Sequence, residues 1–295
     1  MYELIQAAGS SFYIDCPAKI GLVRLDPERV CLIDSGSDKD AGRKVRQILD
    51  REGWKLEAIY NTHSNADHIG GNRYLQGQTG CKIFAPGIEA DFTNHPLLET
   101  AFLYGGYPPK ELRHKFLMAQ ESEALPLTAA DLPDGVTAIP LPGHFFDMTG
   151  FRTADDVVYL ADCLSSAETL EKYRIGFIYD VAAYLDTLEK VKQMTAKLFV
   201  PAHAAAAETI APLAQQNIDQ VGEIADRIVS LCVEPLLFEQ ILQKLFCAFD
   251  LTMNAEQYVL VGSTVRSYLS WLHDQERIDM LFENGTLLWR ATGSN

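Results

Sequence analysis

The chain contains the stretch Ala58-Ile59-Tyr60-Asn61-Thr62-His63-Ser64-Asn65-Ala66-Asp67-His68-Ile69-Gly70-Gly71-Asn72. A short apolar run ends at Asn61, and the next seven residues hold two histidines and a carboxylate. Imidazole nitrogen and carboxylate oxygen are ligands that zinc and iron commonly take in proteins. The two glycines that follow allow a tight turn of the backbone beside the site. The stretch therefore predicts a metal-binding loop, which the rest of the chain should complete.

The length and charge of the chain limit the classes of protein to which it can belong. At 295 residues it can bury a large core and form one large domain with a smaller one. Its 40 acidic and 25 basic side chains give a formal net charge of -15. This balance disfavours nucleic acid as a partner, because contacts with phosphate depend on Lys and Arg. It also argues weakly against an anionic membrane surface, and simple solubility is its plainest meaning.

The cysteines and the N-terminus bear on the cellular compartment. The six cysteines are scattered, without a Cys-x-x-Cys pair, and fit a reducing compartment better than a disulfide framework. The first residues show no basic region followed by an apolar core, so no secretory signal is expected. No apolar run approaches the roughly 20 residues that span a bilayer. We therefore expect a cytoplasmic protein with no membrane partner.

The first 232 residues carry the pattern of a layered α/β fold. Turn residues separate short apolar runs that predict strands at Ser11–Asp15, Ile20–Asp26, Val30–Asp34, Leu56–Asn61, Lys82–Ala85, Val136–Leu141, Val157–Ala161 and Lys197–Val200. Apolar residues at helical spacing predict helices at Lys39–Glu52, Val181–Thr195 and about Glu208–Cys232. Strands followed by helices, twice over, indicate an α/β sandwich.

Two regions depart from this pattern. Residues 88–125 combine aromatic side chains, a Gly-Gly pair and many charges without strand alternation, and we predict a helical, lid-like insertion over the site. Its aromatic residues are expected in the core more often than in a pocket. From residue 233 the pattern predicts helices and then a hairpin around Asn284-Gly285, namely Leu236–Phe249, Ala255–Val261, Thr264–Asp274, Ile278–Phe282 and Thr286–Arg290. We therefore predict a catalytic domain, residues 1–232, and a small winged-helix-like domain, residues 233–295.

Four candidate ligand groups share one placement, because each follows an apolar strand: the His63/Asp67/His68 cluster, His144, Asp162 and His203. Loops at strand ends in α/β sheets collect into a common crevice, so groups distant in sequence can converge. Alone, each histidine would more often be structural and Asp162 a helix cap. Together they predict a metal centre.

These motifs resemble those of the metallo-β-lactamase superfamily. Thr62–His68, Pro142-Gly143-His144, Leu160-Ala161-Asp162 and Pro201-Ala202-His203 are similar to its successive metal motifs, and Val30–Gly36 is similar to its early strand motif. The likeness covers roughly residues 10–205 and implies a four-layer αββα sandwich with the metals at one edge. It implies hydrolysis by a metal-bound hydroxide of esters, thioesters, lactams, lactones or phosphodiesters.

The resemblance also implies a role for each residue. His63 and His144 would bind a first metal, Asp67, His68 and His203 would bind a second, and Asp162 would bridge the two. Asp34 would support the ligands from behind without contacting a metal. Asp67 could also accept or relay a proton as a catalytic group. The ligand types predict zinc, one or two ions, with iron or manganese as alternatives.

The chain departs from the family's motif at Asn65, where a second histidine is usual. An amide oxygen is a poorer zinc ligand than imidazole, so the first site is weakened. Three alternatives stay open. The second site alone could work, with Asp67, His68, Asp162 and His203. Asn65 could ligate weakly, or His95 or His114 from the insertion could substitute. Finally, the site could hold metal without catalysis.

We expect a metal-dependent hydrolase of a small ester, thioester or lactone, with a layout that resembles glyoxalase-II-like thioesterases. One alternative is nucleic-acid processing through the winged-helix-like tail. However, residues 222–295 hold ten acidic against five basic residues, whereas a nucleic-acid binder needs a basic stripe. The tail is therefore expected to pack on the core or to form a homodimer contact. The other alternative is a metal- or ligand-binding protein that has lost catalysis.

Overall fold

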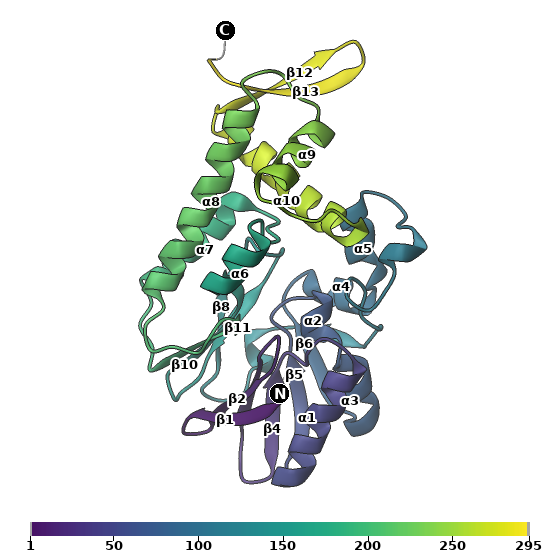
Figure 1. The fold of residues 1–295 in the computed structure, drawn as a ribbon. Coiled ribbons are helices and arrows are strands. Elements are labelled where there is room, and N and C mark those ends of the chain that lie inside the picture. The colour runs from purple at the N-terminus through teal and green to yellow at the C-terminus, as the bar shows by residue number, and fades with distance from the viewer. Residues whose placement is uncertain (1, 294–295) are drawn as a thin grey trace.

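Two β-sheets pack face to face at the centre of the computed structural model, which describes residues 2–293 (Figure 1). The larger sheet has the strand order β1 to β7: Glu3–Ala8, Ser11–Asp15, Ile20–Arg24, Arg29–Ile33, Lys55–Tyr60, Lys82–Ala85 and Ala124–Pro126. Its strands are antiparallel from β1 to β4 and parallel from β4 to β7. The smaller sheet has the order β11-β10-β9-β8: Leu198–His203, Val157–Ser165, Thr149–Arg152 and Thr137–Pro140.

Helices cover both outer faces of this pair of sheets and continue beyond it at one end (Figure 1). In chain order, helices α1 to α10 are Lys39–Glu52, Ala66–Ile69, Asn72–Thr79, Glu89–Asn94, Leu97–Tyr104, Ala167–Tyr173, Val181–Lys192, Ala211–Leu231, Phe238–Ala248 and Ala255–Asp274. Two short 3₁₀ turns lie at Lys110–Leu112 and Ala129–Asp131. A separate hairpin consists of β12, Ile278–Glu283, and β13, Thr286–Ala291.

Three buried clusters define the layers. Between the sheets, Tyr60 and Phe84 stack with ring centroids 5.5 Å apart, and Tyr159 faces them from the smaller sheet. Outside the larger sheet, α1 and α3 bury apolar side chains such as Val45 and Leu75. Outside the smaller sheet, α7 and α8 also bury apolar side chains. The predicted four-layer αββα sandwich is therefore confirmed, with metal-ligand candidates at one edge of the two sheets.

Helix α1 shows why the sequence could be read correctly here. Asp38 caps it by accepting hydrogen bonds from the backbone N–H groups of Asp40 and Ala41, and Gly53 ends it at φ 73°. Its buried face holds the apolar residues that the spacing predicted, and its bounds are those expected. Capping, periodicity and stop signal agree, so local and tertiary preferences select the same structure.

The C-terminal region differs from its prediction in one element. The two helices expected at Ala255–Val261 and Thr264–Asp274 are one continuous helix, α10. Gly262 lies inside it, and a glycine lowers helix stability by only about 1 kcal/mol, which packing of α10 offsets. The hairpin is confirmed, with Asn284 at φ 49° and Gly285 at φ 76°, as a two-residue hairpin turn of this type requires.

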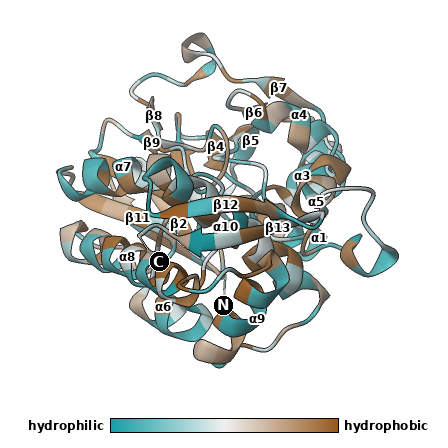
Figure 2. Ribbon diagram, turned by 90° about the horizontal axis from the view of Figure 1, so that it is seen from above, coloured by the Kyte–Doolittle hydropathy of each residue, from teal (hydrophilic) through white to brown (hydrophobic). Residues whose placement is uncertain are grey.

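The C-terminal helices share a core with the sandwich. One buried cluster contains Ile224 and Ile228 of α8 together with Leu242 of α9 and Tyr268 of α10. Figure 2 shows the β12–β13 hairpin lying across the end of this assembly, over α10. The domain boundary at residue 233 and the likeness to a winged helix stay predictions. Within residues 2–293, none of the helices combines the length and apolar character that crossing a membrane requires.

The insertion predicted at residues 88–125 contains the helices α4 and α5 and a 3₁₀ turn, which cover somewhat less than half of its length. It ends in β7, an unpredicted strand that pairs with β6 in the larger sheet. Its aromatic side chains divide into two kinds: Phe92 is buried, whereas Tyr107 and Phe116 are 70% and 65% exposed. The expectation that the aromatic side chains of the insertion lie in the core therefore holds for only some of them.

Candidate metal centre

Strand ends bring the predicted ligand residues to one edge of the sandwich. His63, Asp67 and His68 follow β5, and Asp34 follows β4. The smaller sheet supplies the other three, with His144 after β8, Asp162 inside β10 and His203 as the last residue of β11. All six proposed ligands lie together, in two groups that share Asp162: Asp67, His68, Asp162 and His203 in one, and His63, His144 and Asp162 in the other.

Asp162 is the centre of this arrangement. Its Oδ1 atom lies 2.9 Å from His68 Nε2. Its Oδ2 atom lies 3.1 Å from His203 Nε2, 3.6 Å from His144 Nε2 and 4.0 Å from His63 Nε2. Asp67 Oδ2 lies 3.2 Å from His203 Nε2, and its side chain is 41% exposed, the most open of the group. Four imidazoles therefore direct the same ring atom at one carboxylate.

Buried atoms without partners test whether these residues suit a metal. His63 Nε2, His68 Nε2 and Asp162 Oδ1 are buried, and among the described residues none has a hydrogen-bond partner of suitable geometry, although His68 Nε2 and Asp162 Oδ1 lie 2.9 Å apart. An unsatisfied buried polar atom is costly, and a cluster of three at one point is unusual in a folded protein. Divalent cations take nitrogen and carboxylate ligands of this kind, so the residues fit the metal that the sequence predicts.

Hydrogen bonds behind the ligands fix which ring nitrogen carries the proton. Asp34 is 3% exposed, and its Oδ2 lies 2.7 Å from His68 Nδ1 and accepts a bond from Thr62 Oγ1 at 2.7 Å. Thr62 Oγ1 lies 2.9 Å from His63 Nδ1. A carboxylate only accepts, so the hydroxyl proton goes to Asp34 and the hydroxyl oxygen accepts from His63. Both histidines therefore carry a proton on Nδ1, so Nε2 is the nitrogen that can bind metal.

A hydrogen bond behind His203, on the smaller sheet, fixes the position of its ring proton in the same way. Its Nδ1 lies 3.1 Å from the carbonyl oxygen of Pro17, which can only accept a hydrogen bond. The proton therefore sits on Nδ1, and Nε2 faces Asp162 and Asp67. Partners of this kind orient metal-binding histidines and raise their basicity. The sequence resemblance implied this role for Asp34 but gave no sign of Thr62 or Pro17.

Unusual backbone conformations place two of the ligands. Ala161 has φ 50°, and the pairing of β10 with β11 shifts register on both sides of it. Such a bulge re-aims the next side chain, here Asp162, and β10 then continues to Ser165 instead of ending at Ala161 as predicted. Gly143, before His144, has φ 118°, and a Cβ there would lie 2.2 Å from the backbone nitrogen of Tyr184. Only glycine fits that position.

The Gly70-Gly71 pair serves a purpose other than the predicted tight turn. Both residues have ordinary negative φ angles at a helix boundary. A Cβ at Gly70 would lie 2.3 Å from the backbone of Ser37, and one at Gly71 would lie 2.3 Å from the carbonyl oxygen of Ser35. The glycines therefore allow the segment after β4 to approach the metal loop closely.

The charge around the histidines sets their protonation. Burial lowers the pKa of His63 well below its usual range and keeps this imidazole neutral. Burial has the same tendency at His68, but Asp162, Asp67 and Asp34 together raise its pKa well above the usual range. Asp162 is the main cause that raises the pKa of His203 to about 10. A metal that binds these two histidines must therefore displace protons.

The structure also decides between the substitutes considered for the missing histidine. His114 Nε2 lies 3.0 Å from Glu256 Oε1 of α10, and His95 is exposed at the end of α4. Within residues 2–293, neither belongs to a group that could hold a metal, so the alternative that either completes the first site is wrong. Asn65 does lie at the site, with Oδ1 3.0 Å from His144 Nε2.

Two buried carboxylates of the insertion were missed in the sequence. Glu99 of α5 accepts a bond of 2.7 Å from Asn65 Nδ2. Glu89 of α4 accepts bonds from the backbone N–H groups of Ser64 and Asp147, and from the Ser64 hydroxyl at 2.6 Å. No spacing rule links these glutamates to the metal loop, because only the folded insertion brings them there.

Glu89 leads to a prediction about stability and pH. Burial raises its pKa from 4.5 to about 7, so its contribution to stability is complete below pH 4.5 and is lost as the pH rises through 7. Relative to Glu89→Gln, the metal-free wild type should lose up to about 3 kcal/mol of unfolding free energy between about pH 5 and about pH 8. Urea denaturation of both proteins across this range measures the loss, with the exposed Glu171→Gln as control. A difference that does not change with pH would contradict this assignment.

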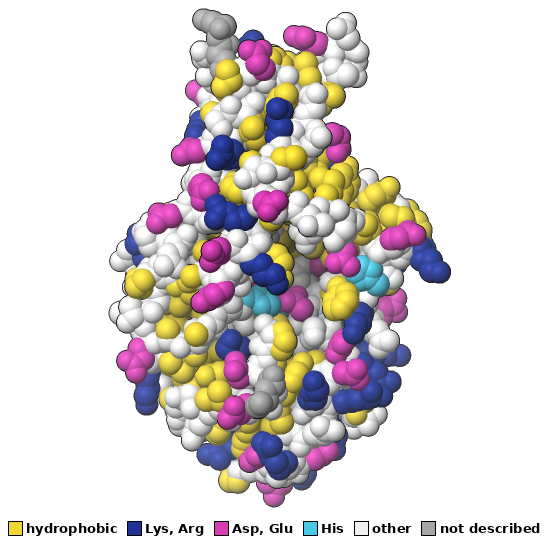
Figure 3. All heavy atoms as spheres, viewed as in Figure 1, with side chains coloured by type: hydrophobic (Ala, Val, Ile, Leu, Met, Phe, Trp, Pro, Cys, Tyr) yellow, Lys and Arg dark blue, Asp and Glu magenta, His cyan; other side chains and the backbone are white. Residues whose placement is uncertain are grey.

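Two connected cavities open beside the ligands. A cavity of about 560 Å³ borders His203 and is lined by Lys172, Tyr173 and Arg174 on one side and by Gln257 and Leu260 of α10 on another. A smaller space of about 60 Å³ shares Arg174, Phe177 and His203 of its lining and also borders His144 and Asp162. Figure 3 shows the surface hollowed between the C-terminal helices and the sandwich, with histidine atoms in the hollow. The C-terminal region therefore forms part of the wall of the cleft.

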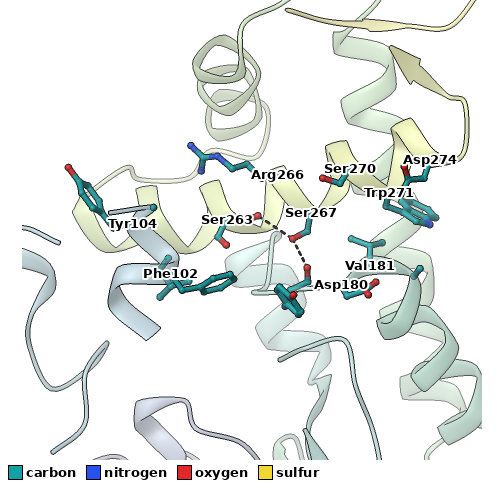
Figure 4. Close-up of a pocket in the computed structure, with 14 residues that line it drawn as sticks. Phe102, Tyr104, Asp180, Val181, Ser263, Arg266, Ser267, Ser270, Trp271 and Asp274 are labelled. Carbon is teal, nitrogen blue, oxygen red and sulfur yellow. Dashed lines mark hydrogen bonds between the residues drawn. The ribbon is translucent and has the colours of Figure 1, made fainter. Parts of the chain in front are cut away.

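A larger groove lies elsewhere. It encloses about 750 Å³ between α5 and α10, and Figure 4 shows Ser263, Ser267 and Ser270 of α10 along one side. None of its lining residues is a proposed metal ligand. Phe102 and Tyr179 separate it from the metal centre as members of an aromatic cluster that reaches Phe145, beside His63. The larger volume of this groove therefore does not mark the position of the metal centre.

Comparisons with known proteins agree with this geometry. Residues 13–203 match the model of the metallo-beta-lactamase superfamily, which covers every proposed ligand. Among solved structures, a beta-lactamase domain protein from Burkholderia ambifaria is similar with a TM-score of 0.76 and 16% identity, over 98% of this chain and 94% of that one. A metallo-beta-lactamase family protein from Thermus thermophilus is similar with a TM-score of 0.72 and 14% identity, over 99% and 98%. At these identities the likeness concerns the fold alone.

Sequence relatives match over short stretches. A hydroxyacylglutathione hydrolase from Methylococcus capsulatus is 46% identical over 39 residues, which are 13% of this chain and 15% of that protein. Another from Nitrobacter hamburgensis is 50% identical over 42 residues, 14% and 16% of the two chains. The chain thus spans only a small part of these relatives. On the match to the family model, the chain belongs to the metallo-beta-lactamase superfamily.

Proposed function

We propose that this protein hydrolyses a small ester, thioester or lactone with the help of one or two divalent ions, of which zinc suits the ligands best. One observation carries the proposal: the Nε2 atoms of four histidines converge on the buried carboxylate of Asp162 at the foot of a cleft. A cleft of about 560 Å³ has the size of a small-molecule site. The acidic tail favours such a substrate over nucleic acid.

The residues of the chain would divide the work as follows. Bound divalent ions would supply Lewis acidity and a water nucleophile near neutral pH. Asp162 and the histidines would hold them, with the proton of His68 kept on Nδ1 by Asp34. Asp67 is the most exposed carboxylate of the group, lies beside His203 and would accept a proton as the substrate reacts. The buried ring of Phe145 lies behind His63 and excludes water there.

Turnover of a defined thioester tests this function. The zinc-loaded protein should hydrolyse a hydroxyacylglutathione, the substrate class named by the short sequence matches, or a simple aryl ester or lactone. Asp67→Ala should lower the rate by about 10²–10⁴-fold, the usual contribution of a positioned proton acceptor. Thiol release, followed with a chromogenic reagent, measures the thioester reaction. A protein that binds zinc but hydrolyses none of the three would be the non-catalytic binding protein instead.

A further inference from the structure

Asn65 lies between a proposed metal ligand and a buried carboxylate. Its Nδ2 donates a hydrogen bond of 2.7 Å to Glu99 Oε1, and its Oδ1 lies 3.0 Å from His144 Nε2. Glu99 is only 6% exposed. Glu99 Oε1 accepts this bond, so Glu99 holds the NH₂ group of Asn65 on its own side. The amide oxygen is therefore turned toward the first ligand group.

The atoms of the first ligand group are spaced as the ligands of one metal ion would be. His144 Nε2 lies 3.6 Å from Asp162 Oδ2, and His63 Nε2 lies 4.0 Å from the same oxygen. Ligand atoms of a tetrahedral zinc ion lie roughly 3.3 Å apart, given metal–ligand bonds of about 2.0–2.1 Å. Asn65 Oδ1, at 3.0 Å from His144 Nε2, fits a fourth position in this group.

We propose that Glu99 is a positioning residue that makes Asn65 an effective ligand of the first metal site, an inference that rests on the metal centre of the proposed function. An amide oxygen binds zinc weakly. A hydrogen bond from the amide NH₂ to the Glu99 carboxyl oxygen polarises the amide and increases the negative charge on the amide oxygen. The buried glutamate thereby compensates for the histidine that the family's motif has at this position.

The surroundings of Glu99 suit this role. In the described part of the chain, Asn65 is the only group that donates a hydrogen bond to it. Its neighbour Thr100 donates to the carbonyl oxygen of Leu117 at 2.9 Å, which fixes α5 within the insertion. Leu103 and Leu117 pack in one buried cluster with Val259 of α10. The insertion and the C-terminal helix thus hold Glu99 rigidly, so its bond to Asn65 is preorganised.

Titration of metal-free protein with zinc alone, in competition with a chromophoric chelator, tests the proposal without turnover. Glu99→Met should weaken one of two bound ions by about 10–100-fold, the usual effect of losing a partner behind a ligand, and leave the other unchanged. Glu99→Gln keeps an oxygen acceptor and should restore affinity close to wild type. In an Asn65→Ala background, Glu99→Met should have no further effect, because Glu99 acts through Asn65.

Three results would overturn the proposal: two ions bound with wild-type affinity by Glu99→Met, equal weakening of both ions, or an undiminished effect of Glu99→Met in the Asn65→Ala background. If Glu99→Met does not fold, asparagine-selective ¹⁵N labelling of the wild type decides. The side-chain NH₂ signal of Asn65 should shift on zinc binding at the first site, and an unchanged signal refutes coordination. Failure to hydrolyse any substrate would contradict the proposed function but leave these metal affinities intact.

Discussion

Asp162→Ala is expected to abolish tight metal binding at both sites. Asp162 is the one residue that both candidate ligand groups share. Its Oδ1 faces His68, and its Oδ2 faces the other three histidines. Loss of a directly bound, shared carboxylate should exceed the 10–100-fold that removal of a supporting residue typically costs. Hydrolysis should fall with it to the rate of the metal-free protein.

Elemental analysis of protein purified without added metal measures this loss. A wild-type value near two ions per chain would support both sites despite Asn65, and a value near one would point to the second site alone. Asp186→Ala, which removes an exposed carboxylate from α7, is the control and should leave the content unchanged. Metal content that survives in Asp162→Ala, with the fold verified by circular dichroism, would refute the assignment of Asp162.

The sandwich could be predicted because its strands and helices carry their own local signals. The bounds of β2, β6 and α1 are those expected from apolar runs, caps and turn residues. The strands β1 and β9 were missed for a physical reason. β9 is only four residues long, Thr149-Gly150-Phe151-Arg152, and it is a strand because β8 and β10 pair with it from either side. Such non-local pairing leaves little trace in the sequence.

The residues of the metal centre also divide into those that the sequence predicts and those that it does not. The ligands follow strand ends in an order that the sequence displays, so their convergence could be expected before the structure was known. The groups that orient these ligands could not be expected from the sequence. Thr62 and Pro17 act through one hydroxyl and one backbone carbonyl, while Glu89 and Glu99 reach the loop only because the insertion folds over it. Asn65 was visible as a departure, but its glutamate partner was not.

Asp34→Asn should impair both metal sites while keeping the fold. Asp34 has φ 66°, a left-handed conformation that asparagine tolerates as well as aspartate does. The new side chain can still accept the bond of 2.8 Å from the Thr62 backbone N–H through Oδ1. Its NH₂ group then replaces Oδ2 and faces His68 Nδ1 and Thr62 Oγ1. The opposite orientation would set two donors against each other and is disfavoured.

The change of one oxygen to NH₂ reverses the direction of these hydrogen bonds. His68 Nδ1 must now accept, so the ring carries a proton only on Nε2, the atom that faces Asp162. Thr62 Oγ1 also accepts from the new NH₂ group, so its hydroxyl proton turns to His63 Nδ1, which lies 2.9 Å away. His63 then carries its proton on Nε2 as well. One substitution thus places the only ring proton on the metal-binding atom of a histidine in each site.

We expect zinc affinity to fall by about 10–100-fold at each site, as for other partners that orient metal-binding histidines. Ring ¹⁵N shifts of the metal-free variant should report Nδ1 without a proton at His68 and at His63, with Nε2 protonated in both rings, and zinc titration measures the affinities. Asp155→Asn is the matched control, because Asp155 also accepts bonds from a backbone N–H and a hydroxyl, those of Ser10 and Ser11, away from the metal centre. If Asp34→Asn keeps both tautomers and both affinities, Asp34 packs in the loop without directing the ligands. If the tautomers change and zinc binding does not, Nε2 is not the atom that holds the metal.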